Sequence, residues 1–252
     1  MIRFLSLLLG WLLLSAATEP TLVPDVSDRK IEIRYSFHGT QILVFGAILY
    51  PNGVVPDGQT DIAIVLRGPS QSIRVREKQK LGGLIWVNAD ETRFRSAPAF
   101  YAIASSRPIK KIVDANTADI FELGLNSLQL SPSSGMAPDA EHRFEQGLID
   151  LRSRNALYAN QAGTVEITNG VLYRAQINIP ARVPVGRYTA EHFLIRHGHV
   201  LAVATSNIEI HKIGFERFVA VSAVALPLEY GLVVVALSVL FGWGAGVLFK
   251  RI

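Results

Sequence analysis

A small cluster of hydrogen-bond donors, Ser105, Ser106 and Arg107, follows an apolar run at residues 101–104. Hydroxyl and guanidinium groups suit oxyanions, because a guanidinium offers a planar fork of N–H donors that matches two oxygens. The cluster therefore predicts a binding site for a small anion at the end of a strand. The same three residues are equally compatible with an ordinary strand end, and both interpretations stay open.

The segment His197-Gly198-His199 holds the best candidates for metal binding. Two histidines two positions apart in a strand point to the same side and could share a metal ion. However, His197-Gly198 also suits a two-residue hairpin turn. His192 and His211 supply no third ligand at a predictable spacing, and the chain has no cysteine. We therefore expect turn residues here, with no metal site and no cofactor.

Glu141, His142 and Glu145 lie close together in a segment with helical periodicity. A zincin helix places two histidines at i and i+4 around its glutamate, and this segment has only one histidine. No Gly-x-Ser-x-Gly elbow or phosphate-cradling glycine loop occurs in residues 18–212. These residues predict a solvated helix face, and we expect no catalytic residues and no enzymatic activity.

Strands are expected to position most of these groups, because apolar and polar residues alternate along much of the chain. Residues 62–66, 73–76 and 171–179 show this period of two. Two uninterrupted apolar runs, residues 42–45 and 84–87, are typical of central strands. Glycine, proline and asparagine separate these runs as turns, and short strands at such spacing favour a β-sandwich.

Tyr188 follows a turn-forming segment at residues 184–186 and begins a late strand. A tyrosine at this place is typical of the tyrosine corner in an immunoglobulin-like sandwich. We therefore predict a mainly β fold, an immunoglobulin-like β-sandwich over residues 18–212. Two smaller domains are the alternative.

Helical periodicity interrupts the strands at about residues 112–160. Two apolar faces with this period can be traced: Ile120, Leu123 and Leu128, and then Phe144, Leu148 and Leu151. Pro138 suits the first turn of the second helix. The sandwich is thus expected to carry a two-helix insertion.

Both ends of the chain are apolar. Arg3 precedes an apolar run at residues 4–14, and the small residues 15–17 follow it. This order predicts a cleaved secretory signal peptide at residues 1–17, since the run is too short to span a membrane. Residues 230–249 carry no charge and no proline. Twenty helical residues span about 30 Å, so this segment predicts a transmembrane helix.

Lys250 and Arg251 follow the predicted transmembrane helix directly. Basic residues mark the cytoplasmic side, so residues 250–252 are expected to form a short cytoplasmic tail. The signal peptide gives the same orientation. We expect a single-pass protein of the inner membrane whose bulk lies in the periplasm.

Two further features concern the membrane. Gly242 and Gly246 form a small-xxx-small pair, which lets another helix approach closely. Residues 213–228 start with charges and turn apolar before Pro227, which predicts an interfacial helix in the plane of the bilayer. A kinked continuation of the membrane helix is the alternative.

The charges between the two apolar ends are nearly balanced, with 22 Lys and Arg against 20 Asp and Glu between Thr18 and Phe218. Nucleic-acid-binding domains usually carry a strongly basic face, so we expect no nucleic acid partner. One local run, residues 74–80, is basic at alternate positions. It indicates either an edge strand protected by lysine or a contact with anionic lipid or a partner.

With these elements in order, the chain resembles the alphaproteobacterial transmembrane protein family Alph_Pro_TM. The resemblance covers nearly the whole mature chain. The phrases that carry it are Ile-Leu-Val-Phe-Gly-Ala at 42–47, Gly-Leu-Ile-Trp-Val-Asn at 83–88, Phe-Tyr at 100–101 with Ser-Ser-Arg-Pro at 105–108, and Gly-Phe-Glu-Arg-Phe at 214–218. The resemblance supplies no functional residues, and it implies a place beside sulfite-exporter-like permeases.

We therefore expect a non-enzymatic, membrane-anchored periplasmic domain that binds a partner such as an inner-membrane permease. A periplasmic module that binds a small anion through Ser105, Ser106 and Arg107 is the second hypothesis. The lipid bilayer is the remaining expected partner.

Overall fold

The computed structural model describes residues 19–33, 37–132, 137–212 and 215–249. The fold is mainly β, with 48% of residues in strands and 28% in helices. The chain divides into two compact units. The first contains His38–Glu209 together with the residues up to Ile31, and the second contains Glu32–Phe37 and Ile210–Ile252.

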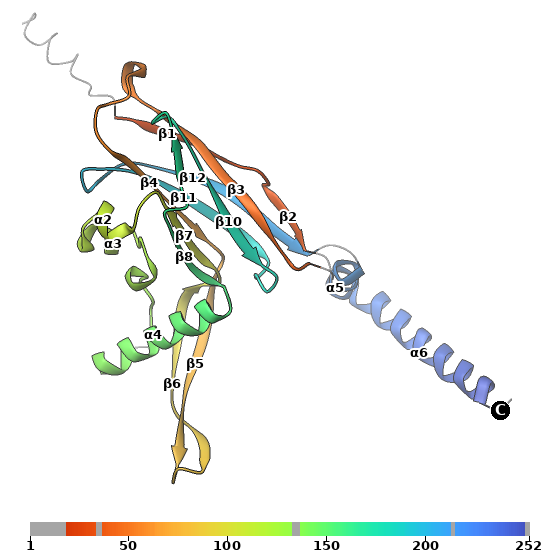
Figure 1. The fold of residues 1–252 in the computed structure, drawn as a ribbon. Helices are drawn as coiled ribbons and strands as arrows, with labels where there is room; N and C mark the ends of the chain where they lie inside the picture. The colour runs from red at the N-terminus through yellow and green to blue at the C-terminus, as the bar shows by residue number, and fades with distance from the viewer. Residues whose placement is uncertain (1–18, 34–36, 133–136, 213–214, 250–252) are drawn as a thin grey trace, which may run out of the picture. The chain divides into compact units, whose positions relative to one another are not determined.

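The first unit holds a four-stranded antiparallel sheet (Figure 1). In spatial order its strands are β1 (Thr21–Val26), β3 (Gly39–Leu49), β10 (Leu172–Pro180) and β9 (Glu166–Thr168). The alternation along β10 is the predicted one, since Tyr173, Ala175, Ile177 and Ile179 are buried and their neighbours are exposed. Strands β3 and β10 are far apart in the sequence, and Ile42 pairs with Ile177 between them.

A six-stranded sheet forms the second layer. In spatial order its strands are β2 (Lys30–Ile33), β12 (His199–Lys212), β11 (Gly186–Arg196), β4 (Thr60–Arg67), β7 (Tyr101–Ser105) and β8 (Tyr158–Ala162). Strands β7 and β8 pair in parallel. Parallel neighbours need a crossover connection, and the helical segment between them provides it. Strand β4 is buried on both faces, because all of its residues from Asp61 to Leu66 are buried. The alternation predicted for residues 62–66 is therefore wrong, since Ala63 and Val65 are as buried as their neighbours.

A buried hydrogen bond joins the facing sheets. The Tyr173 hydroxyl on β10 lies 3.0 Å from Nδ1 of His192 on β11, and Nε2 of His192 lies 3.2 Å from the Ser206 hydroxyl. The Tyr188 hydroxyl donates to the Pro184 carbonyl oxygen at 2.6 Å, as expected of a tyrosine corner. The mainly β fold with several sheets is thus confirmed, whereas the immunoglobulin-like sandwich stays a prediction.

The crossover contains α2 (Ile109–Ile112), α3 (Ala115–Ile120), the 3-10 turn η2 (Leu125–Ser127) and α4 (Pro138–Arg154); another 3-10 turn, η1 (Pro51–Gly53), follows β3. The prediction of one helix through Ile120, Leu123 and Leu128 is wrong. The backbone leaves the helical region at Glu122 (φ 50°) and Gly124 (φ 141°), so the chain turns before Leu128.

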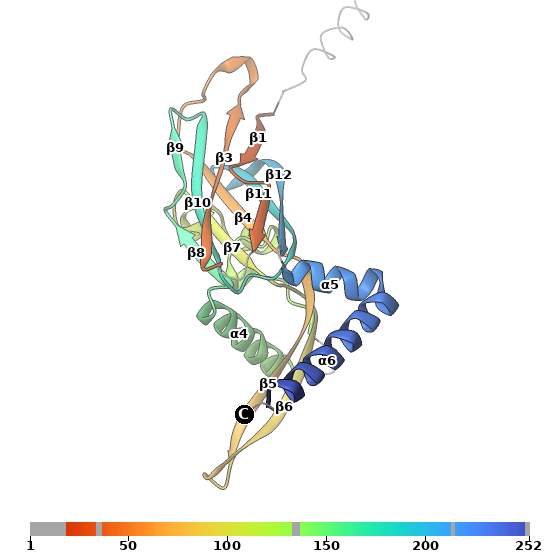
Figure 2. The same ribbon diagram turned by 90° about the vertical axis from the view of Figure 1, so that its right-hand side faces the viewer.

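The second predicted helix is confirmed as α4, which begins at Pro138. It buries a narrow face made by Phe144 and Leu148, whereas Leu151 is half exposed rather than part of that face. This face covers one half of a long separate hairpin, β5 (Ser70–Leu81) and β6 (Ile85–Pro98). Both views show the hairpin running past α4 (Figures 1 and 2).

The prediction that residues 84–87 form a central strand is wrong. They lie at the far end of the β5–β6 hairpin, which pairs with no third strand among the described residues. Leu84 is 88% exposed, Ile85 64% and Trp86 62%. The apolar run therefore lacks the covering layer that a central strand has.

The second unit contains α5 (Phe215–Ala225) and α6 (Pro227–Phe249). The break between them falls at Leu226, directly before Pro227, where the missing N–H of proline favours a helix start. Within α6, residues Pro227–Val247 form the one candidate membrane span found in the described parts of the chain. The predicted signal peptide at residues 1–17 and the tail with Lys250 and Arg251 lie outside the described residues.

Candidate functional site

A buried carboxylate, Asp61 at the start of β4, organises the residues that the sequence singled out. The Ser106 hydroxyl donates to Asp61 Oδ1 at 2.7 Å, and Arg107 Nε donates to the same oxygen at 2.9 Å. A second N–H of Arg107 donates to Asp61 Oδ2. The chain's own carboxylate thus already occupies the predicted anion-binding donors Ser106 and Arg107.

Burial alone would raise the pKa of Asp61, since it disfavours the charged form. The hydrogen bonds from Arg107 and Ser106 outweigh that effect, and they hold the pKa of this carboxyl below its ordinary value. Asp61 is therefore ionised at neutral pH and neutralises Arg107. An external anion at this place would have to compete with Asp61.

Ser105 is separated from the other two predicted residues. Its side chain is fully buried in β7, and its hydroxyl has no hydrogen-bond partner within the described structure. The Ser105 carbonyl oxygen instead accepts from the Gly163 backbone N–H at 2.7 Å. Anion binding by Ser105, Ser106 and Arg107 stays a prediction, and Arg107 lines a cavity.

A cationic cavity of about 520 Å³ opens beside the Asp61–Arg107 pair. Its lining residues are Gln59, Asp61, Arg107, Lys110, Lys111, Ile112, Val113, His197 and Gly198. Lys110 and Lys111 are exposed on α2, and neither forms an ion pair with any described residue. Because Asp61 offsets Arg107, these lysines give the cavity a net positive charge.

The His197-Gly198 turn forms one wall of this cationic cavity. Both residues have left-handed backbone angles, with φ of 49° and 82°, and they connect β11 to β12 directly. The predicted hairpin turn is thus confirmed, since a two-residue turn of this kind requires positive φ at both positions. Within the described ranges, no three His, Asp or Glu side chains gather closely enough to hold a metal.

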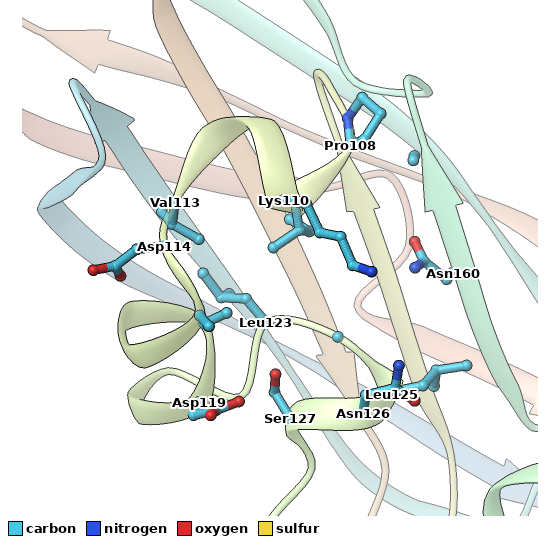
Figure 3. A pocket seen from close by; sticks show the side chains of 15 residues that line it. Pro108, Lys110, Val113, Asp114, Asp119, Leu123, Leu125, Asn126, Ser127 and Asn160 are labelled. Atoms are coloured by element: carbon cyan, nitrogen blue, oxygen red, sulfur yellow. The ribbon is translucent and has the colours of Figure 1, made fainter.

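An apolar cavity of about 670 Å³ adjoins the cationic one and shares Lys110 and Val113 with it (Figure 3). Its walls come from α2, α3, η2 and β8. Figure 3 shows Lys110 extending from α2 across the cavity, with Asn160 of β8 on the opposite side. The remaining wall is largely aliphatic and includes Leu123 and Leu125, and it also carries the carboxylates of Asp114 and Asp119.

Local hydrogen bonds fix the wall formed by α3 and η2. The Asp114 carboxylate caps α3 by accepting from the Thr117 backbone N–H at 2.8 Å. The Tyr101 hydroxyl donates to the Glu122 carbonyl oxygen at 2.7 Å and accepts from the Gly124 N–H at 2.9 Å. Burial raises the pKa of Tyr101, so its hydroxyl keeps the proton that it donates. The cavity wall is therefore held in place by the sheet beneath it.

The family model described as "Putative transmembrane protein (Alph_Pro_TM)" matches residues 21–251. The chain belongs to the Alph_Pro_TM family. The match covers the sheets, the cavities and α6 together. A transmembrane family and one apolar C-terminal helix fit single-pass membrane anchoring. No curated protein and no solved structure matches the chain significantly.

In this Alph_Pro_TM member, the glycines predicted for helix packing lie in the second half of α6. Apart from the neighbouring backbone of α6 itself, a Cβ atom added at Gly242 or Gly246 would meet no atom of the described structure within 4 Å. The space above both glycines is therefore open, and helix packing through them stays a prediction.

Sequence reasoning missed Lys110 and Lys111, although a signal was present. Together with Arg107 they place three cations within five residues, directly after a buried strand. The apolar cavity had no comparable signal, because residues from α2, η2 and β8 meet there only through the parallel pairing of β7 with β8.

Proposed function

We propose that this Alph_Pro_TM protein is a non-enzymatic accessory protein of the inner membrane. Helix α6 crosses the bilayer once, the β-rich unit lies in the periplasm, and the C-terminus lies in the cytoplasm. The domain binds another inner-membrane protein, such as a permease. The observation that carries this proposal is the uniformly apolar and exposed surface of α6.

Helix α6 has no polar face that could turn towards water. Leu232, Val235 and Phe241 are each more than 60% exposed, and the exposed apolar side chains continue on every side of the helix. After Glu229 in its first turn the helix carries no charge. A helix that is apolar all round is stable in lipid, because lipid solvates its whole circumference.

A partner inside the bilayer is supported by Gly242 and Gly246. Membrane helices associate where small residues let their backbones approach closely, and these two glycines leave such a face open. The orientation is supported by the sequence, since Lys250 and Arg251 follow the span and Arg3 precedes the N-terminal apolar run. We also infer an immunoglobulin-like sandwich, which the bond from Tyr188 to Pro184 supports.

Affinity recovery of the full chain from native membranes after cross-linking tests the partner. We expect one inner-membrane protein to be recovered with the wild type and to be lost with Gly242→Leu/Gly246→Leu. Gly231→Leu is the matched control, because it adds the same side chain at an open position of the same helix. Recovery of the chain alone in every case would contradict the proposal.

The orientation has its own test. A reporter enzyme that is active only in the cytoplasm, fused after Ile252, is expected to be active. A fusion that is active only outside the cell would exclude the proposed orientation, and release of the protein by alkaline carbonate would exclude the anchor.

A second candidate function, binding of a small or amphipathic anion, is favoured by Lys110 and Lys111. They line the cationic cavity without an ion-pair partner in the described residues, and Lys110 also lines the apolar cavity. Calorimetry on the detergent-solubilised chain would use sulfite, sulfate, phosphate and a medium-chain carboxylate. Heat that Lys110→Gln/Lys111→Gln abolishes, and Arg182→Gln/Arg187→Gln preserves, would support this function. Absence of heat with all four anions would remove it.

A further inference from the structure

The far end of the β5–β6 hairpin, residues 78–88, presents an apolar surface that no described residue covers. We call these residues the hairpin tip. Leu81 is 66% exposed, and Leu84, Ile85 and Trp86 are more than 60% exposed. Large apolar side chains gathered on one bare projection are unusual in soluble domains, and they mark interaction sites.

Among the described residues, those that cover the hairpin lie at its base. There, Phe94 and Ala97 are buried against Phe144 and Leu148 of α4, in a cluster that Leu130 completes. Arg143 of α4 pairs with Glu77 at 3.0 Å, close to where this cover ends. Beyond Glu77, every residue from Lys78 to Trp86 is exposed. At about 3.3 Å per residue, the strand extends roughly 13 Å from Glu77 to Leu81.

The charges of the hairpin tip all have one sign. Glu77 and Asp90 pair across the hairpin and are the last acidic residues before it. Between them the only charged residues are Lys78 and Lys80. Lys80 pairs with Trp86 across the strands, and its Nζ lies 5.2 Å from the centroid of the Trp86 ring. The apolar end is therefore bordered by two cations and one tryptophan.

The turn itself is shaped to expose this end. Gly82 and Gly83 have φ of 58° and 77°, angles that other residues rarely adopt. They close a short loop between Leu81 and Ile85, which are the last paired residues. Leu84 follows them in the loop and is 88% exposed. The most exposed apolar side chain of the hairpin thus lies at its outermost point.

We propose that the hairpin tip inserts into the headgroup region of a bilayer that contains anionic lipids. Tryptophan is enriched at membrane interfaces, where lysine can reach the phosphates while neighbouring apolar side chains enter the acyl boundary. Lysine near an anionic surface adds attraction. A protein partner is favoured less, because the centres of protein interfaces are depleted of lysine. The tip is thereby a second membrane contact, chemically distinct from α6.

Fluorescence of Trp86 in the full chain tests the insertion directly. Trp11→Phe/Trp243→Phe leaves Trp86 as the only tryptophan. This chain is reconstituted into vesicles of phosphatidylcholine, with or without phosphatidylglycerol, and brominated lipids serve as quenchers. With phosphatidylglycerol present, we expect Trp86 emission to shift to the blue and to be quenched by bromine near the headgroups. Vesicles without anionic lipid should show less quenching.

Two pairs of variants in this single-tryptophan chain separate the contributions. Lys78→Glu/Lys80→Glu should lower the partition equilibrium by at least about fivefold per lysine. Arg182→Glu/Arg187→Glu makes the same change in sign at two exposed residues elsewhere and should have little effect. Leu84→Ser/Ile85→Ser should abolish the quenching. The control Leu49→Ser/Leu172→Ser, also at exposed positions, should preserve it.

Three results would overturn the proposal. Trp86 could remain in water in both kinds of vesicle, or the tip variants could behave like their controls. Trp86 could also be shielded only in native membranes and not in vesicles of the pure protein, which would assign the tip to a protein partner. None of these results depends on Gly242 and Gly246, so the accessory function proposed above stands or fails separately.

Discussion

Two apolar runs of the first unit meet opposite surroundings. Residues 62–66 of β4 are buried completely, with β11 on one side and β7 on the other. Residues 84–87 at the hairpin tip are just as apolar, yet three of the four are more than 60% exposed. The difference lies outside the runs themselves, in whether another element of the chain reaches them. An apolar run therefore predicts that the run is covered, but the cover can come from another molecule as well as from the same chain.

The comparison is sharpest within the single strand β6. Phe94 is fully buried at the hairpin base, and Phe94→Ala should lower the free energy of unfolding by about 3–5 kcal/mol, because it removes a buried ring and leaves a cavity. Urea unfolding of the detergent-solubilised chain, followed by circular dichroism, measures the loss. A loss below about 1 kcal/mol would mean that α4 does not hold the hairpin base.

The contrast between buried and exposed positions should also appear in the pH dependence of stability, through His192. Burial lowers the pKa of His192 to about 4 from 6.5, so between these values the folded state binds fewer protons than the unfolded state. Stability should therefore be complete above pH 6.5 and should fall by about 3 kcal/mol as the pH drops towards 4. His192→Gln should remove this slope. His142→Gln, at an exposed side chain, should retain it, and equal slopes in both variants would contradict the assignment.

The ion pair between Asp61 and Arg107 allows a buried charge to be compared with an exposed one. Arg107→Ala leaves the carboxylate of Asp61 buried without its cation and should cost about 1–3 kcal/mol. Adding Asp61→Asn to this variant should recover part of the loss. Arg154→Ala breaks an exposed pair with Asp150 and should cost less than about 0.5 kcal/mol. Equal costs for the two arginines in thermal unfolding would show that Asp61 is not effectively buried.

The smallest effect is expected at the hairpin tip. Trp86→Ala should change the free energy of unfolding by less than about 0.5 kcal/mol, because Trp86 is 62% exposed and lies outside the buried cluster at the hairpin base. The same urea titration as for Phe94→Ala gives the value. A loss comparable with that of Phe94→Ala would erase the difference between base and tip, and it would show that the tip is covered in the folded protein.

Several parts of the fold could be predicted because their signals are local. The alternation along β10, the start of α4 at Pro138, the His197-Gly198 turn and the bond of Tyr188 each depend on residues that are neighbours in the sequence. The exposure of residues 84–87 could not be predicted, because it depends on how far along the hairpin α4 extends as a cover. The break after α3 was missed because helical period alone does not report the left-handed backbone at Glu122.

The candidate site was predicted only in part. Ser106 and Arg107 were identified as donors, but their acceptor Asp61 lies 45 and 46 positions earlier in the sequence. Only the pairing of β4 with β7 brings these residues together. Ser105 is the last residue of β7, where all five residues are buried, so its hydroxyl does not join the donors of Ser106 and Arg107. Spacing along the chain therefore identified the donors but not the group that they bind.

The pairing of β3 with β10 has a consequence for how the protein is made. The hydroxyl of Tyr50 donates to the carbonyl of Gly170, across 120 positions of sequence. During synthesis the first half of this sheet emerges long before its second half, so β3 presents an unpaired edge while the intervening chain is still being extended. Pairing between strands so far apart in the sequence makes folding slow and leaves an intermediate that is prone to aggregation. We expect a nascent chain halted before β10 to depend on a holding chaperone and the completed chain to leave it.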